Sequence, residues 1–198
     1  MFALFAGLAA GLLHVFSGPD HLAAVAPLVA DDGRQRVEGW RTGLQWGIGH
    51  TIGVLVIACL LLLLREQLPL DAISAYSERI VGVALILVGG WGVWRASRTG
   101  FKPHGHSHSG ASFAMGALHG LAGSSHLFGV LPALAFSTRA ESALYLAGFG
   151  AGAVVAMSAF AAVMGLLTTK FSRRHSSGLL YASSAAALVI GGFWLVGR

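Results

Sequence analysis

The chain has 198 residues, of which 55% are hydrophobic and 11% charged, and its mean hydropathy is +0.71. Soluble domains carry about 25% charged residues, so the composition excludes a soluble domain and a disordered segment and predicts an integral membrane protein. The single cysteine, Cys59, excludes an internal disulfide and a Cys-rich metal site. The net charge of +5 is dispersed over short loops, which argues against nucleic acid as a partner.

Six apolar stretches follow one another along the chain, each bounded by charged or turn residues. They lie near 2–30, 43–64, 80–95, 112–136, 143–168 and 179–197. Because a bilayer core requires about 20 helical residues, these stretches predict an all-α fold with six transmembrane helices. The first stretch contains Gly18 and Pro19, and proline cannot donate a backbone hydrogen bond, so we expect this helix to be broken or kinked. Residues 1–13 lack the basic region of a cleavable signal peptide and are expected to remain as membrane helix.

The distribution of Lys and Arg predicts the orientation in the lipid bilayer. Connections expected on one side carry nine of these residues, and those on the other side carry four. By the positive-inside rule, both termini lie outside and the segment 102–110 lies in the cytoplasm. We therefore expect a multi-pass protein of the cytoplasmic (inner) membrane.

A repeat appears when the sequence is shifted by 105 residues against itself. The aligned pairs are Gly11 and Gly116, His14 and His119, Gly18 and Gly123, His21 and His126, and Pro27 and Pro132. Each unit holds three predicted helices, and an odd number inverts the second unit relative to the first. We expect two inverted three-helix repeats, 1–100 and 112–198, joined by the segment 101–111, with the first helix of each repeat broken or kinked. The substrate site of such transporters lies near the midplane where the repeats meet.

Asp20 is the only acidic residue within the six stretches. A lone carboxylate in hydrocarbon costs about 2.5–3.5 kcal/mol on insertion scales, and intramembrane ionisable groups usually face a cavity, a partner or an ion. The alternative is a structural cap for the helix after the break, because Ser17-x-x-Asp20 resembles a capping box. The two roles are compatible, since a capping carboxylate can also meet an ion.

Five histidines within the stretches are candidate metal ligands: His14, His21, His50, His119 and His126. Along a straight helix His14 and His21 would lie about 10 Å apart, too far for metal–nitrogen bonds of about 2.0–2.1 Å to one ion. Joint ligation therefore requires the break at Gly18. The alternative to metal binding, for each histidine, is a structural role in which the buried imidazole forms a hydrogen bond to a neighbouring carbonyl. The second repeat has Ser124-Ser125 where the first has Pro19-Asp20, so we expect an unequal site.

Three more histidines, His104, His106 and His108, alternate with small residues in the long cytoplasmic connection. Short His-rich tracts are typical of accessory metal-binding segments. A solvated linker explains the same composition equally well.

The segment from His14 to Asp20-His21 resembles the His-x4-Asp-His signature of the nickel/cobalt permeases, with five intervening residues instead of four. Gly49-His50-Thr51 is similar to a second motif of that family, Gly-His-Ser/Thr. The likeness is greatest to the short, urease-accessory-like branch and covers nearly the whole chain in the order of its helices. Larger members have eight helices against the six expected here, and loss of an N-terminal helix would agree with the predicted outside N-terminus. The resemblance implies movement of Ni²⁺ or Co²⁺ across the cytoplasmic membrane, with the first-motif His and Asp essential.

We therefore predict a permease for a divalent transition-metal ion, not an enzyme. The predicted ligands are His14, Asp20, His21 and His50, with contributions from His119 and His126. Imidazole and carboxylate suit Ni²⁺, Co²⁺ and Zn²⁺ alike, and no tightly bound cofactor is expected besides the transported ion. The chain has no phosphate-binding loop, so an ATP-driven version would need a separate subunit. A homo-oligomer and a metal-delivery protein are both left open as partners.

Two other functions fit parts of the pattern. In an intramembrane zinc-dependent hydrolase, three histidines would hold the metal and Asp20 or Ser17 would assist the reaction. An exporter of a small solute or anion is the third alternative. The repeat and the lack of a second intramembrane carboxylate favour metal transport.

Overall fold

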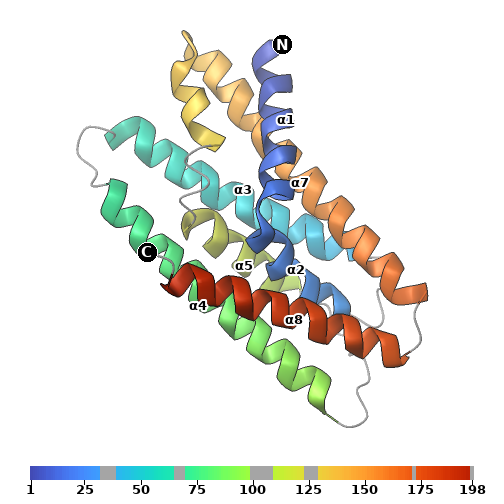
Figure 1. Ribbon diagram of the computed structural model, residues 1–198. Coiled ribbons are helices and arrows are strands. Elements are labelled where there is room, and N and C mark those ends of the chain that lie inside the picture. Colours follow the sequence, from blue (N-terminus) through green and yellow to red (C-terminus); the bar gives the residue numbers. More distant parts are fainter. Residues whose placement is uncertain (32–38, 65–69, 99–108, 123–128, 171–172, 197–198) are drawn as a thin grey trace.

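The computed structural model describes residues 1–31, 39–64, 70–98, 109–122, 129–170 and 173–196 (Figure 1). These residues form seven α-helices and one 3-10 helix, without a strand, which confirms the predicted all-α fold. The helices are α1 (Phe2–Ser17), α2 (Pro19–Asp31), α3 (Gly39–Leu64), α4 (Leu70–Ser97), α5 (Ser109–Ala122), α7 (Arg139–Lys170) and α8 (Arg173–Val196), and the 3-10 helix is η1 (Leu131–Ala135).

Three helices contain segments that are long and apolar enough to cross a membrane. They are Gly39–Leu60 of α3, Arg79–Ser97 of α4 and Arg139–Leu167 of α7, with 22, 19 and 29 residues. Helices α1 and α2 reach the required length only as a pair, which is bent by 71°. The apolar part of α8, Ser177–Phe193, is shorter. The described residues thus contain three candidate membrane spans, or four if the bent pair is counted as one span, as expected of a membrane protein.

Within the described residues each predicted stretch overlaps a helix, but the fourth, 112–136, holds most of α5 and the short η1 instead of one long helix. Several helices also begin earlier than predicted. Helix α4 starts at Leu70 rather than near residue 80, and α8 starts at Arg173 rather than near residue 179. The hydrophobic pattern marks the part of a helix that suits hydrocarbon, whereas backbone hydrogen bonding continues into the polar interface. Apolar length therefore underestimates helix length.

The first predicted helix is broken at Gly18, which confirms the expected break. Helix α1 ends at Ser17, Gly18 is extended with φ −94° and ψ 97°, and α2 begins at Pro19. The Gly18 N–H still donates to the carbonyl of His14 at 3.1 Å. Proline suits the first position of a helix because its missing N–H would have no partner there. The corresponding break predicted for the second repeat lies outside the described residues.

Helix α2 lies inside the bundle and contacts α8, α7, α4, α3 and α5. Every residue from 23 to 30 is buried. Large apolar side chains are exposed on the outer helices instead, as suits a surface in contact with lipid. Examples are Phe2, Leu87, Val189 and Phe193. The segment that carries Asp20 is therefore held in the protein interior rather than in hydrocarbon.

Glycines bring two helix pairs into close contact, α1 with α7 and α3 with α5. A Cβ added to Gly11 would collide with the carbonyl oxygen of Phe149 on α7. A Cβ added to Gly120 on α5 would collide in the same way with the carbonyl oxygen of His50 on α3. Small residues permit this approach between membrane helices, and here they bring the α5 and α3 histidines close together.

Candidate metal centre

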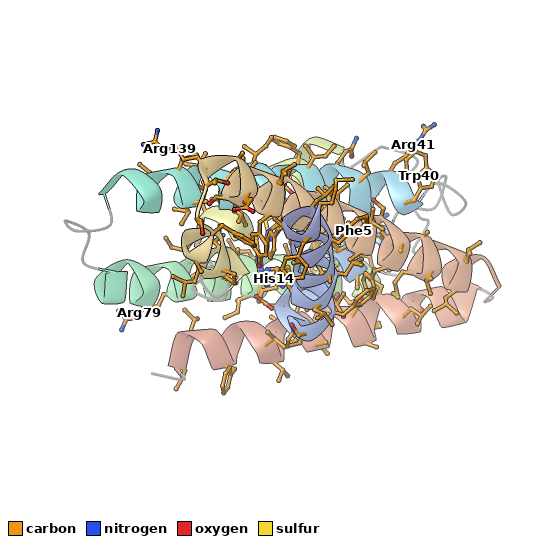
Figure 2. The ribbon with its side chains drawn as sticks, turned by 90° about the horizontal axis from the view of Figure 1, so that it is seen from above. Phe5, His14, Trp40, Arg41, Arg79 and Arg139 are labelled. Carbon is orange, nitrogen blue, oxygen red and sulfur yellow. The ribbon has the colours of Figure 1, made fainter. Side chains whose placement is uncertain are left out.

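Five of the predicted ligands lie together where four helices meet. His14 is in the last turn of α1, Asp20 and His21 are in the first turn of α2, His50 lies in α3, and His119 lies in α5. Asp20, His21, His50 and His119 are at most 5% exposed. Seen from above in Figure 2, His14 lies near the middle of the bundle, whereas the labelled arginines lie at its margins.

His21 is the central residue of the cluster. Its ring centroid lies 4.6 Å from that of His14, 5.0 Å from that of His50 and 4.6 Å from that of His119. The rings of His14 and His50 are 5.7 Å apart and nearly parallel. The predicted convergence of His14 and His21 is therefore present, and the break at Gly18 produces it.

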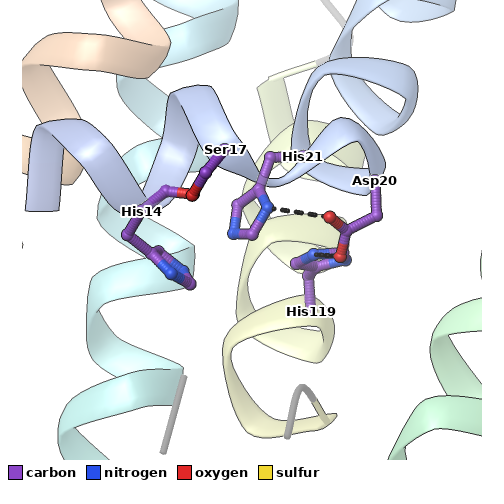
Figure 3. Close-up of polar contacts among 5 residues, drawn as sticks. All are labelled: His14, Ser17, Asp20, His21 and His119. Atoms are coloured by element: carbon purple, nitrogen blue, oxygen red, sulfur yellow. Dashed lines mark hydrogen bonds and ion pairs between the residues drawn. The ribbon is translucent and has the colours of Figure 1, made fainter. Parts of the chain in front are cut away.

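Asp20 connects two of the histidines through different oxygens (Figure 3). Its Oδ1 lies 3.2 Å from Nδ1 of His21, and its Oδ2 lies 3.0 Å from Nε2 of His119. Because a carboxylate only accepts hydrogen bonds, the shared proton of the first contact belongs to Nδ1 of His21. The first turn of a helix also favours negative charge, so α2 stabilises the Asp20 carboxylate in the interior.

Ser17 does not form the capping box considered as the alternative role of this segment. Its exposed hydroxyl donates to the carbonyl oxygen of His14, 3.2 Å away in its own helix. The Asp20 carboxylate faces His21 and His119 instead of the backbone before it. Of the two roles considered for Asp20, the geometry therefore favours the one within the histidine cluster.

Glycine at position 18 is required by the cluster itself. A Cβ there would collide with Nδ1 of His21 and would lie 2.9 Å from Oδ1 of Asp20. When the added Cβ lies less than 3.0 Å from another heavy atom, that atom must move, so His21 and Asp20 would have to shift. Gly18 thus both ends α1 and leaves room for the Asp20–His21 contact.

The donor atoms form two groups with metal-ligand spacing that have His21 in common. One group is His14, His21 and His50, and the other is Asp20, His21 and His119. Within each group, one ligand atom from every residue lies within 4.8 Å of the others. Three donors of nitrogen or oxygen suit a divalent ion of the nickel, cobalt or zinc type.

Trp46 forms an apolar wall of the cluster that the sequence analysis did not identify. It is fully buried, and its ring stacks on His50 with centroids 5.0 Å apart. The same ring lies 5.7 Å from His21 and 5.3 Å from His119. Trp46 precedes His50 by four residues and so shares its helix face, which is the signal that would have identified it. A buried aromatic ring on this side of the cluster restricts the orientations of the imidazole rings.

A small pocket between α2, α4 and α5 is lined in part by His119. Apart from His119, the side chains that line it are apolar, among them Ala24, Val81, Leu85 and Met115. The pocket therefore adds no nitrogen or oxygen donor to those of the cluster.

The remaining candidate ligands lie outside the described residues. They are His126 in the second repeat and His104, His106 and His108 in the connection. Their roles, like metal binding by the cluster, stay predictions.

No family model matches the chain, and no solved structure matches it. Two chloroplast proteins of Arabidopsis thaliana, FOR GROWTH AND FERTILITY 2 and FOR GROWTH AND FERTILITY 1, are 37% and 33% identical to it over 93% of its length. The chain covers 54% and 56% of these two proteins, about half of each. The urease accessory protein UreH of Bacillus sp. (strain TB-90) is 30% identical over 85% of this chain and 78% of its own length. With most of both sequences aligned, the chain belongs to the family of the urease accessory protein UreH.

Proposed function

We propose that the protein is a permease that moves a divalent transition-metal ion, Ni²⁺ or Co²⁺, across the membrane that holds it. One observation carries this proposal: a carboxylate and four imidazoles from four helices meet inside a membrane protein. Ionisable groups buried in membrane proteins typically mark substrate or ion pathways. Imidazole and carboxylate are ligands that such ions accept.

The motifs in α1–α2 and α3 support nickel or cobalt as the ion. The His14 to His21 segment and Gly49-His50-Thr51 resemble the motifs of nickel/cobalt permeases. The name of the relative UreH, a urease accessory protein, describes an accessory protein rather than an enzyme. Both features support transport of metal over catalysis.

The proposed architecture is a pair of inverted repeats with the site between them. In support of it, α1 packs on α7 while α5, the repeat-equivalent of α1, packs on α3, the repeat-equivalent of α7. His119 and His14, which are equivalent in the repeat, both lie next to His21. The proposed location is the cytoplasmic membrane with both termini outside, from the distribution of Lys and Arg.

Purified protein in vesicles tests this function directly. Vesicles that contain a metal-responsive dye should take up Ni²⁺ or Co²⁺ only when the wild-type chain is present. The variant Asp20→Asn keeps the shape of the side chain and removes its charge, so we expect metal flux to fall at least about 100-fold with insertion unchanged. The matched control is Glu141→Gln, which removes an exposed carboxylate in the first turn of α7 and should leave flux unchanged.

Two results would contradict the proposal. The first is the absence of metal flux through correctly inserted wild-type protein. The second is wild-type flux through well-folded Asp20→Asn protein, which would show that the ion does not depend on this carboxylate.

A further inference from the structure

We propose that the cluster holds one metal ion at either of two adjacent positions that share His21, and that the ion moves between them during transport. Position A is formed by His14, His21 and His50, and position B by Asp20, His21 and His119. This inference rests on the proposed function and specifies how the same residues would carry the ion.

The donor atoms support two positions because they form two sets of three rather than one set of five. His14 and His50 belong only to the first set, and Asp20 and His119 belong only to the second. His21 is the sole member of both, and its ring lies within 5.0 Å of the His14, His50 and His119 rings, centroid to centroid. An ion that leaves one set can therefore enter the other and have His21 as a ligand in both positions.

The two ring nitrogens of His21 face the two sets separately. Nδ1 lies 3.2 Å from Oδ1 of Asp20, on the side of position B. In Figure 3 the other ring nitrogen, Nε2, lies on the side of the ring that faces His14. A neutral imidazole has one N–H and one free nitrogen, so His21 can bind an ion in only one position at a time. Occupation of A and of B is thus mutually exclusive.

Asp20 has a different role in each position. With the ion in A, Nε2 of His21 binds the metal and Nδ1–H donates to Asp20, the arrangement in which a carboxylate orients a metal-binding histidine. With the ion in B, Asp20 and Nδ1 bind the metal themselves. The change requires Nδ1 to give its proton to water and Nε2 to take one from water, so the number of protons on the protein is unchanged.

The two positions also differ in charge. Position A offers three neutral imidazoles, whereas position B offers two imidazoles and a carboxylate. Asp20 acts on the ion in both states, through its hydrogen bond to the metal-binding His21 in A and as a direct ligand in B, so each position keeps a share of its negative charge. Conduction requires sites that bind an ion and also release it, and two adjacent sites of three donors each satisfy this better than one closed site of five.

Titration of the purified full-length chain with Co²⁺ tests the proposal, because the visible spectrum of Co²⁺ reports the ligands. We expect one Co²⁺ per wild-type chain. The variant His50→Ala removes a ligand of A alone, and His119→Ala removes a ligand of B alone. Each should still bind one Co²⁺, with a spectrum of mixed nitrogen and oxygen ligands for His50→Ala and of nitrogen ligands for His119→Ala. Metal flux should fall at least about 10-fold in both.

The double variant His50→Ala/His119→Ala should bind Co²⁺ at least about 100-fold more weakly than either single variant. X-ray absorption of the bound Co²⁺ gives an independent count of nitrogen and oxygen ligands. Loss of tight binding in both single variants, with folded protein, would show one combined site and overturn the two positions. Two Co²⁺ ions bound at once to the wild-type chain would overturn their exclusivity. Either outcome leaves the proposed function standing, whereas wild-type protein that binds no Co²⁺ contradicts the function itself.

Discussion

The two segments related by the repeat, α1–α2 and α5, contribute unequally to the cluster. The first supplies His14, Asp20 and His21 from both sides of its break, and α5 supplies His119. The sequences differ at the decisive point, because Gly18-Pro19-Asp20 corresponds to Gly123-Ser124-Ser125. A single carboxylate on one side of a shared site therefore makes the two halves chemically different, even though their histidines correspond.

Replacement of His21 by Ala should impair metal binding far more than replacement of His119 by Ala. His21 belongs to both groups of donors and His119 to one. Removing His21 should weaken Co²⁺ or Ni²⁺ binding at least about 100-fold, because no group of three remains. Removing His119 should weaken it about 10-fold or less, since His14, His21 and His50 persist.

Calorimetric titration of the purified variants measures both affinities. Comparable thermal stability in the two variants is the control, because both replace a buried imidazole. Equal losses of affinity would indicate a symmetric site to which α2 and α5 contribute equally.

Gly18→Ala is expected to have a smaller effect on the same segment. The added methyl would collide with Nδ1 of His21 and crowd Oδ1 of Asp20, so the two side chains must separate. We expect metal affinity to fall about 10-fold while the protein still inserts. The matched control is Gly90→Ala in α4, where a Cβ meets nothing within 4 Å. Metal titration of both variants checks the difference, and unchanged affinity in Gly18→Ala would show that the Asp20–His21 contact is dispensable.

Local signals in the sequence predicted much of this segment. Glycine followed by proline predicted the break, and the break in turn predicted the meeting of His14 and His21, because both depend on the backbone of one short stretch. The spacing of apolar residues predicted where α3, α4, α7 and α8 lie, although not the residue at which each begins. These features require no knowledge of which helices pack together.

Features that depend on packing between helices were not predicted. The contacts of Trp46 with His21 and His119, and of Asp20 with His119, join side chains from different helices. Arg95, at the end of the third predicted stretch, is buried in the last turn of α4. Hydrophobic pattern cannot show which polar side chains a bundle will enclose, since that depends on the faces that neighbouring helices cover.

The smallest effect on the cluster is expected from the histidines of the connection. Replacement of His104, His106 and His108 together by Ala should leave the affinity of the buried site unchanged within about 2-fold. The buried cluster already has two groups of three donors from α1, α2, α3 and α5, and a His-rich tract can receive an ion without being part of that site. The effect should instead appear in flux when metal is scarce, because capture at the membrane surface then limits the rate. Titration of the triple variant beside His21→Ala separates the two regions: loss of tight binding in the triple variant, with binding retained in His21→Ala, would place the main site in the connection rather than in the bundle.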